Sequence, residues 1–245
     1  GVYSVDKTLY LNTDIDLTDS SFTTFASMQA SFDGMNHTIR NLANCAGGVF
    51  TQFKGKAVRN LTLENITSNC KWNQGILIDM YQGSAPLTIE NITLRNCIGN
   101  KVEANGMGGL LGYSAVAQSG TIRNCLIEGV TLNGADKGNI GLIVSQVNQA
   151  GWLIENVTVR NSIVQSTAGW GIGAAFGEIT GANSVVRNIA VFNNTVPEGQ
   201  SALMGVFKKG SLELSNIMAA GNTGAARVLT VTTSGNEACT GFTAT

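Results

Sequence analysis

The chain has little charge, little proline and little histidine. Charged residues make up 13% of its 245 residues, about half of the usual quarter in a globular domain. There are 2 prolines and 1 histidine, and the formal net charge is −1 without a basic cluster. This balance argues against nucleic acid as a partner. Neutral Asn, Thr and Ser side chains must therefore cover much of the surface.

Long apolar runs and metal-ligand motifs are also missing. No stretch approaches the roughly 20 apolar residues that a membrane-spanning helix requires, and Gly141 interrupts the longest one, Ile140 to Val147. We therefore expect no membrane insertion. The sequence has no C-x-x-C pair and no H-E-x-x-H motif, so we expect no metal ion and no cofactor. It begins at Gly1 without methionine, which fits a processed chain or an excised fragment.

The sequence does contain one short phrase many times over. VRNLTL begins at Val58, and close variants of it follow. A glycine-containing phrase, such as GLLGY at Gly109, keeps step with it. Self-similarity with a period between 20 and 50 residues is typical of solenoids, propellers and arrays. The central asparagines, spaced by 31, 33, 32, 32 and 28 residues, are Asn60, Asn91, Asn124, Asn156, Asn188 and Asn216.

Within each unit the apolar residues alternate, as in a strand with one buried face. In the fourth copy Val157 and Val159 are apolar, and Thr158 between them is polar. The units are rich in Ile, Val, Thr, Asn and Gly rather than in helix formers, and they lack the hairpin signals of a propeller blade. The sequence therefore predicts an all-β, right-handed parallel β-helix of about six to seven coils with a repeat of roughly 32 residues.

Stacking the copies as parallel strands accounts for an alternation of charge. The residues that precede the asparagines are Arg59, Glu90, Arg123, Glu155 and Arg187. Four residues after the asparagines the alternation recurs in the opposite phase. Opposite charges on neighbouring strands contribute roughly 0.2 to 1 kcal/mol per pair. We therefore expect charge ladders on an outer face, and we interpret the asparagines as side-chain ladders at corners.

One continuous repeat indicates a single elongated domain over residues 1–245, long enough to bury an apolar core. We interpret residues 1–45 as an N-terminal cap, residues 46–223 as regular coils, and residues 224–245 as the last coil and the C-terminal edge. An unpaired strand edge templates further pairing, and the C-terminal segment lacks an amphipathic capping helix. We therefore expect either an adjoining domain or end-to-end stacking of copies into a fibre or surface layer.

Several motifs support a family resemblance. FDGMNHTIRNL lies within Ile15 to Leu42, GGVF begins at Gly47, and the GLLG quartet begins at Gly109. With these motifs the chain resembles secreted and cell-surface β-helical proteins with GLUG-type repeats, including repeat regions of bacterial adhesins and of some large surface peptidases. The quartet is complete once, since Val144 replaces its last glycine in the next coil. The resemblance implies an extracellular structural or adhesive module; in the peptidases these repeats lie outside the catalytic domain.

Catalytic groups in a β-helical enzyme should stand out as departures from the repeat. Glycoside hydrolysis needs two carboxyl groups about 5 to 9.5 Å apart. The ladders already account for Glu64, Glu90, Glu128 and Glu155, and Asp14, Asp16 and Asp19 lie in the entry segment, where Asp16 and Asp19 are interpreted as turn residues. Asp79, Glu103 and Glu178 remain, scattered over different coils. We therefore predict a non-enzymatic module with no catalytic residues. The alternative is a carbohydrate-active β-helix, a polysaccharide lyase or glycosidase, that depends on Asp79 or Glu178.

Aromatic residues at similar places in their coils suggest a hypothesis of carbohydrate binding. Trp72 and Trp170 lie three coils apart, roughly 14 Å along the stack, and Tyr81 and Tyr113 are near-equivalent. Exposed rings could stack on sugars, while a tryptophan folded over a neighbouring loop is an equally good interpretation. The expected partners are copies of the chain itself, adjoining domains, or surface glycans and cell-wall polymer.

Two kinds of covalent modification also follow from the sequence. Corner asparagines generate N-x-T sequons automatically, so Asn36 and Asn193 are the better candidates for glycosylation, if a eukaryote secretes the chain. The 5 cysteines cannot all pair within one chain. Cys45 and Cys70 lie in less regular segments and could form a disulfide. Cys125 occupies an inward position and is interpreted as a small buried hydrophobe.

Overall fold

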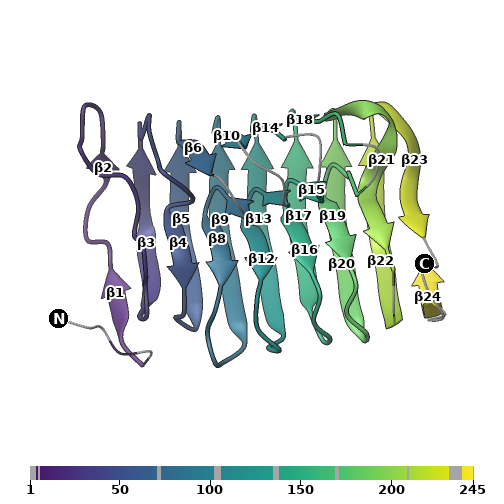
Figure 1. Ribbon diagram of the computed structural model, residues 1–245, viewed down its shortest axis with the longest axis horizontal. Coiled ribbons are helices and arrows are strands. Elements are labelled where there is room, and N and C mark those ends of the chain that lie inside the picture. Colours follow the sequence, from purple (N-terminus) through teal and green to yellow (C-terminus); the bar gives the residue numbers. More distant parts are fainter. Residues whose placement is uncertain are drawn as a thin grey trace.

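The computed structural model describes residues 4, 6–70, 73–101, 106–134, 138–168, 171–208, 210–231 and 239–244. Within these ranges the chain forms parallel strands and no helix. The strands stack along one axis, so that each coil lies beside the next (Figure 1). The predicted parallel β-helix is therefore confirmed. The regular part makes about five turns of the roughly 32-residue repeat, slightly fewer than the six to seven coils predicted.

The repeated phrase forms the longest side of each coil, which we call sheet 1. Its strands pair in register, so that Ile122 lies between Ile89 and Ile154, and all three side chains are buried. The short β2 (Ile15–Asp16) pairs with β3. Along the stack the other strands are β1 (Thr8–Tyr10), β3 (Ser31–Arg40), β5 (Ala57–Glu64), β9 (Leu87–Arg95), β13 (Gly120–Glu128), β17 (Leu153–Arg160), β20 (Ser184–Phe192), β22 (Gly210–Ala220) and β24 (Cys239–Ala244).

Two further sides of the coil belong to one sheet, which we call sheet 2, because the long strand β21 joins them. β21 (Thr195–Phe207) pairs with both β18 and β19, and β23 (Thr223–Val231) pairs with β21. One side consists of β4 (Phe50–Phe53), β8 (Ile78–Tyr81), β12 (Leu111–Ser114), β16 (Val144–Val147) and β19 (Phe176–Ile179). The other side consists of β6 (Thr67–Cys70), β10 (Ile98–Lys101), β14 (Thr131–Asn133) and β18 (Ile163–Gln165).

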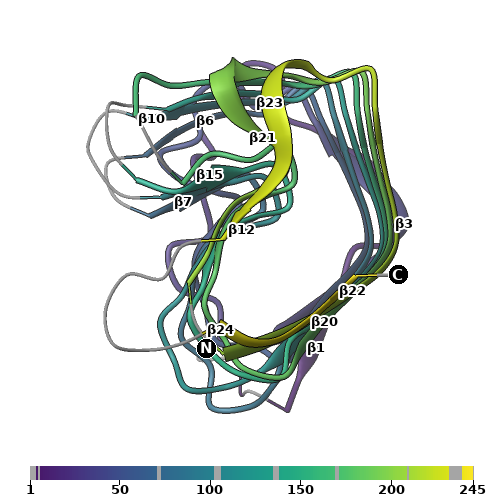
Figure 2. The same ribbon diagram turned by 90° about the vertical axis from the view of Figure 1, so that its right-hand side faces the viewer.

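A third, smaller sheet consists of β7 (Gln74–Gly75), β11 (Met107–Gly108) and β15 (Ile140–Gly141). Figure 2 shows β6, β10, β7 and β15 projecting to one side of the main coil. We call β6, β10, β14 and β18, together with this small sheet, the arm. The glycine phrase forms the tight bend between the arm and the main coil. A Cβ atom on Gly108 would lie 2.1 Å from the carbonyl oxygen of Leu111, so the bend excludes larger residues.

The phrase asparagines form a ladder at a corner, as predicted. Asn156 has a φ of 55°, in the left-handed region that asparagine tolerates better than most residues. Its Nδ2 donates to Asn124 Oδ1 at 3.1 Å, and Asn188 Nδ2 donates to Asn156 Oδ1 at 2.8 Å. The side-chain amides thus satisfy one another along the stack while the backbone turns.

The predicted charge ladders are confirmed as well. Arg123 lies in register between Glu90 and Glu155. The Arg123 Nε atom is 2.9 Å from Glu90 Oε1, and an Arg187 guanidinium nitrogen is 2.6 Å from Glu155 Oε2. The arginine side chains are nearly half exposed, so each pair contributes little to stability. The in-register alternation still favours this alignment, because a slip of one coil along the next would move each arginine away from its glutamates.

The last coil is less regular than those before it. β24 pairs with residues Gly210 to Leu214 of β22, with a register shift after Gly210. Farther along β22, the inward-facing Ile217 and Ala219 are only partly buried. No helix among the described residues has the length and apolar character needed to cross a membrane.

Candidate ligand-binding face on the arm

The outer surface of the arm carries a straight row of Thr and Ile side chains, which the first residues of β21 and β23 continue. On β14, Leu132 points into the core, whereas its neighbours Thr131 and Asn133 are only partly buried. Ile98 and Ile163 are 38% and 36% exposed, unusually open for large apolar residues in this molecule. The paired residues of this Thr/Ile row are Thr67, Ile98, Thr131, Ile163, Thr195 and Thr223.

A row of amides runs parallel to the Thr/Ile row, two residues farther along each strand. Asn69, Asn100, Asn133 and Gln165 are paired in register. Asn100 Nδ2 donates to Asn69 Oδ1 at 3.1 Å, and Asn133 Nδ2 donates to Asn100 Oδ1 at 2.8 Å. We call these two rows together the arm face. Neighbouring strands lie about 4.8 Å apart, so the arm face repeats uncharged side chains at that interval.

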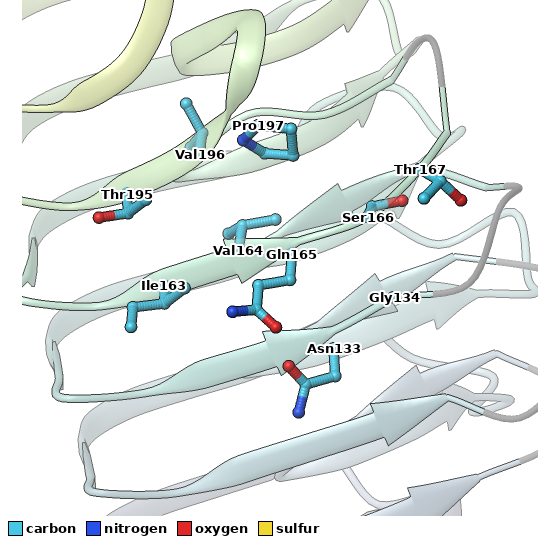
Figure 3. Close-up of a pocket in the computed structure, with 10 residues that line it drawn as sticks. All are labelled: Asn133, Gly134, Ile163, Val164, Gln165, Ser166, Thr167, Thr195, Val196 and Pro197. Atoms are coloured by element: carbon cyan, nitrogen blue, oxygen red, sulfur yellow. The ribbon is translucent and has the colours of Figure 1, made fainter.

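The arm face ends in an open groove with a volume of about 480 Å³. Figure 3 shows Ile163 and Gln165 on β18, with Asn133 from the preceding coil and Thr195 and Pro197 from the following one. The lining thus combines hydroxyl and amide groups with apolar side chains. Its members are Asn133, Gly134, Ile163, Val164, Gln165, Ser166, Thr167, Thr195, Val196 and Pro197.

The groove opens where β21 separates from β18. The two strands pair only at Ile163 and Thr195, where Thr195 N donates to Ser162 O at 2.9 Å. In a parallel ladder the next rung would be donated by residue 197 to the carbonyl of Val164. Pro197 has no N–H group, so that rung cannot form. β21 then continues with register shifts against β23, so beside β18 a step remains, where β18 has no paired strand on that side beyond Ile163 within the described part of the chain.

Of the four aromatic residues proposed as sugar contacts, Trp72 and Trp170 lie outside the described residues. The interpretation of Tyr81 is wrong, because its side chain is fully buried and its hydroxyl donates to the Ala85 carbonyl. Tyr113 pairs with Met80, and Tyr81 pairs with Ser114. This offset of one residue turns the two tyrosines to opposite faces. Tyr113 is partly exposed, and Asn148 Nδ2 donates to its hydroxyl at 3.4 Å.

Of the three scattered acidic residues considered for catalysis, Glu103 lies outside the described residues, and Asp79 and Glu178 are buried at different places. Asp79 is 2% exposed, and its Oδ1 accepts hydrogen bonds from Gly48 N at 2.7 Å and Gly75 N at 2.9 Å. Asp79 therefore holds backbone of two adjacent coils at the arm junction. Glu178 is also 2% exposed. Within the described ranges, no group of three or more His, Cys, Asp or Glu side chains has an arrangement that could hold a metal ion.

Glu178 lies within a compact polar cluster beneath the arm. Lys208 Nζ is 2.6 Å from its Oε2, and Asn139 Nδ2 donates to the same oxygen at 2.9 Å. Thr180 Oγ1 donates to Oε1 at 2.7 Å, and Gln146 Nε2 does so at 3.1 Å. Burial raises the pKa of the Glu178 carboxyl, but the hydrogen bonds from Lys208, Thr180 and Gln146 outweigh burial and lower it. The carboxylate is thus held in its charged form.

The proposed modification sites remain predictions. Asn36 and Asn193 are both exposed, so each sequon is accessible to a glycosyltransferase. Cys45 is buried, and its Sγ lies 2.7 Å from the Thr23 carbonyl oxygen. The Cys70 side chain lies outside the described part of the chain. Cys125 is 4% exposed at an inward position of β13, which confirms its interpretation as a small buried hydrophobe.

Sequence reasoning missed the arm face and the partners of Glu178. The arm face does leave a signal, because T-S-N at Thr67, I-G-N at Ile98 and T-L-N at Thr131 recur in step with the main phrase. Lys208 leaves none, and Asn139 only repeats the place of Asn73, since each precedes a strand that pairs in register with β11. Only the folding of three coils brings Asn139 and Lys208 to one carboxylate.

No protein-family model and no curated protein matches the chain. Its fold is similar to a crystal structure described as that of a candidate immunoglobulin A1 protease from Bacteroides ovatus. The TM-score is 0.60 and the sequence identity is 19%, and the match covers 100% of this chain and 79% of that one. At this identity the likeness shows the β-solenoid fold alone.

Proposed function

We propose that the chain is a non-enzymatic, extracellular structural or adhesive module that binds an extended surface glycan or cell-wall polymer along the arm face. The observation that carries the proposal is the arm face itself, where two straight rows of uncharged side chains lead into a groove. The resemblance to the GLUG-type repeats of adhesins points to the same role and the same location.

The chemistry of the arm face suits a polysaccharide. Sugar rings present hydroxyl groups at their edges and C–H groups on their faces. In the groove, Gln165 and Thr195 offer hydrogen bonds while Ile163 and Pro197 offer apolar contact. Sites of this kind combine an apolar surface with a few placed polar groups. The rows continue over several coils, so a long polymer would contact more of them than a short oligosaccharide.

A binding screen with immobilised polysaccharides and a glycan array tests the proposal. Thr195→Lys would place a long charged side chain in the groove and should weaken binding by about tenfold or more, equivalent to about 1.4 kcal/mol. Thr93→Lys is the matched control, because Thr93 also points outward from a regular strand but lies on sheet 1. Equal binding by both variants, or no binding by the wild type, would count against the arm face.

The alternative is a carbohydrate-active enzyme, and the protease name of the structural neighbour adds proteolysis to the activities worth testing. Asp79 binds backbone amides and Glu178 is enclosed in an ion pair, so neither is free to act on a polymer in the groove. Incubation with polysaccharides and with immunoglobulin A1 should therefore release no fragments. Reducing ends, unsaturated sugars or peptide products that persist after repurification would overturn the non-enzymatic proposal.

End-to-end stacking is a second structural role. β24 covers only the first part of β22, and the inward-facing Ile217 and Ala219 are partly exposed at that end. A further parallel strand would cover both side chains and pair the remaining backbone. Sedimentation should show a mass that increases with protein concentration. A strict monomer at the highest attainable concentration would exclude self-stacking but would leave glycan binding untouched.

A further inference from the structure

Three residues from successive coils meet at one buried oxygen atom. Asn139 immediately precedes β15, Glu178 lies in β19, and Lys208 immediately follows β21. Glu178 Oε2 is 2.6 Å from Lys208 Nζ and 2.9 Å from Asn139 Nδ2. The amine of the lysine and the carboxamide of the asparagine are therefore close neighbours, with a carboxylate in contact with both.

The surroundings hold this group in place and largely exclude water. Asn139 is 6% exposed, Glu178 is 2% exposed, and the Lys208 side chain is 27% exposed. A Cβ atom at Gly171 would lie 2.1 Å from Asn139 Oδ1, so the backbone of the next coil packs directly onto the carboxamide. Among the described residues, Asn139 Oδ1 has no hydrogen-bond donor. A buried carbonyl without a donor is costly and is open to polarisation.

The geometry points to an intramolecular amide cross-link between Lys208 Nζ and Asn139 Cγ, formed by the protein itself with Glu178 as the general acid and base. The reactants are pre-positioned within one rigid fold, which removes most of the entropic cost of bringing an amine and an amide together. A simple buried ion pair would explain the contact between Lys208 and Glu178. It would not explain why a carboxamide shares the same carboxylate oxygen.

The reaction balances without any other reactant. Glu178 accepts a proton from the Lys208 ammonium group, and the neutral amine attacks Asn139 Cγ. The new C–N bond forms, and the attacking nitrogen gives up a second proton, which Glu178 relays to Nδ2. The bond between Cγ and Nδ2 then breaks, and Nδ2 leaves as ammonia. Ammonia then takes the proton from Glu178 and departs as an ammonium ion. An ammonium side chain and a primary amide thus become a secondary amide, nothing is oxidised or reduced, and the carboxylate is restored.

A rotation of the Asn139 carboxamide would improve the geometry further. A half turn of the carboxamide exchanges the positions of Oδ1 and Nδ2 with little change in the shape of the group, so hydrogen bonds decide which orientation is present. Once Glu178 carries the proton, it donates rather than accepts, and a rotated Asn139 would place Oδ1 against it. The same carboxyl group would then polarise the carbonyl that Lys208 attacks. The bond would fasten the arm at β15 to the end of β21, across the coil that contains β19.

Mass spectrometry of the unfolded, intact protein tests the cross-link. The wild type should be lighter than its sequence by one molecule of ammonia, and a peptide map should contain one branched peptide that joins Asn139 to Lys208. Lys208→Arg keeps the positive charge beside Glu178 but removes the amine, and Glu178→Gln keeps a polar side chain but removes the acid and base. Both variants should have the full sequence mass.

Lys56→Arg is the matched control, because Lys56 Nζ also lies 2.6 Å from a carboxylate, that of Asp6, in an exposed pair. This variant should lose ammonia as the wild type does. A wild-type protein at full sequence mass after prolonged incubation would overturn the inference. So would ammonia loss that persists in Lys208→Arg or maps elsewhere, for example to a cyclised Asn133–Gly134 bond. These outcomes do not depend on whether the arm face binds a glycan.

Discussion

Replacing Asn156 by alanine or by glycine tests whether the corner ladder works as described. Asn156 has a φ of 55° and takes part in two amide hydrogen bonds along the stack. Alanine removes the hydrogen bonds and leaves a Cβ atom in the left-handed region. Glycine removes the same hydrogen bonds but adopts that backbone without strain. The chain already uses glycine this way, since Gly129 and Gly221 have φ values of 64° and 65° at the next corner.

The expected magnitudes follow from these two differences. Two exposed hydrogen bonds contribute about 0.5 kcal/mol each. A left-handed alanine costs roughly 1 to 2 kcal/mol, whereas glycine loses about 0.5 to 1 kcal/mol through its greater freedom in the unfolded chain. Asn156→Ala should therefore reduce the free energy of unfolding by about 2 to 3 kcal/mol. Asn156→Gly should reduce it by about 1.5 to 2 kcal/mol and remain the more stable of the two.

Urea unfolding followed by circular dichroism measures this order, provided that the slope with urea stays the same in both variants. Thr158 supplies the control pair, since it lies two residues farther along the same strand and points outward. There, alanine should be more stable than glycine by about 0.5 to 1 kcal/mol. If Asn156→Ala equals or exceeds Asn156→Gly in stability, the left-handed backbone at residue 156 does not disfavour a Cβ atom as argued.

Three more outcomes are expected. Asp79→Ala should destabilise the fold by about 2 to 4 kcal/mol in urea, because two buried N–H groups lose their acceptor, and a change below about 0.5 kcal/mol would contradict this. Burial raises the pKa of Cys97 and Cys125 to about 12, so iodoacetamide should label both only after unfolding; rapid native labelling would disprove it. Burial raises the pKa of Asp33, but hydrogen bonds outweigh burial and lower it below 3.8. Stability from this carboxylate should therefore vanish as the pH falls below about 3.8, and an acid unfolding curve unchanged in Asp33→Asn would refute it.

The regular features could be predicted because each follows from one residue type repeated at one place. Alternating apolar residues indicated the buried face of sheet 1, and Arg123 between Glu90 and Glu155 indicated parallel, in-register stacking. The structure contains both. A period in sequence becomes a period in space when each coil lies directly on the last, so local patterns are sufficient for this part of the fold.

The arm and its contacts could not be predicted in the same way. Tyr81 and Tyr113 looked equivalent because the spacing between coils varies by a residue or two, yet an offset of one residue reverses the side of a strand. Tyr81 is consequently buried and Tyr113 is not. Glu178 looked like a departure from the repeat, and it is one. Its partners, Asn139 and Lys208, are set by how the arm folds over the main coil, and no local pattern carries that information.

The groove interrupts the repetition of the arm face at one position along the stack. Along the regular coils the arm face repeats its amides and alternates Thr with Ile, so a polymer bound there could slide by two coils with little change in contacts. Pro197 ends that equivalence, because it stops the pairing of β21 with β18 after Thr195. The Val164 backbone, Gln165 and Ile163 then line a step that no other described coil repeats. A ligand end or branch seated in this step would fix the register of the whole polymer. Pro197→Ala restores an N–H group that can pair with β18 and should therefore reduce binding without altering the two rows.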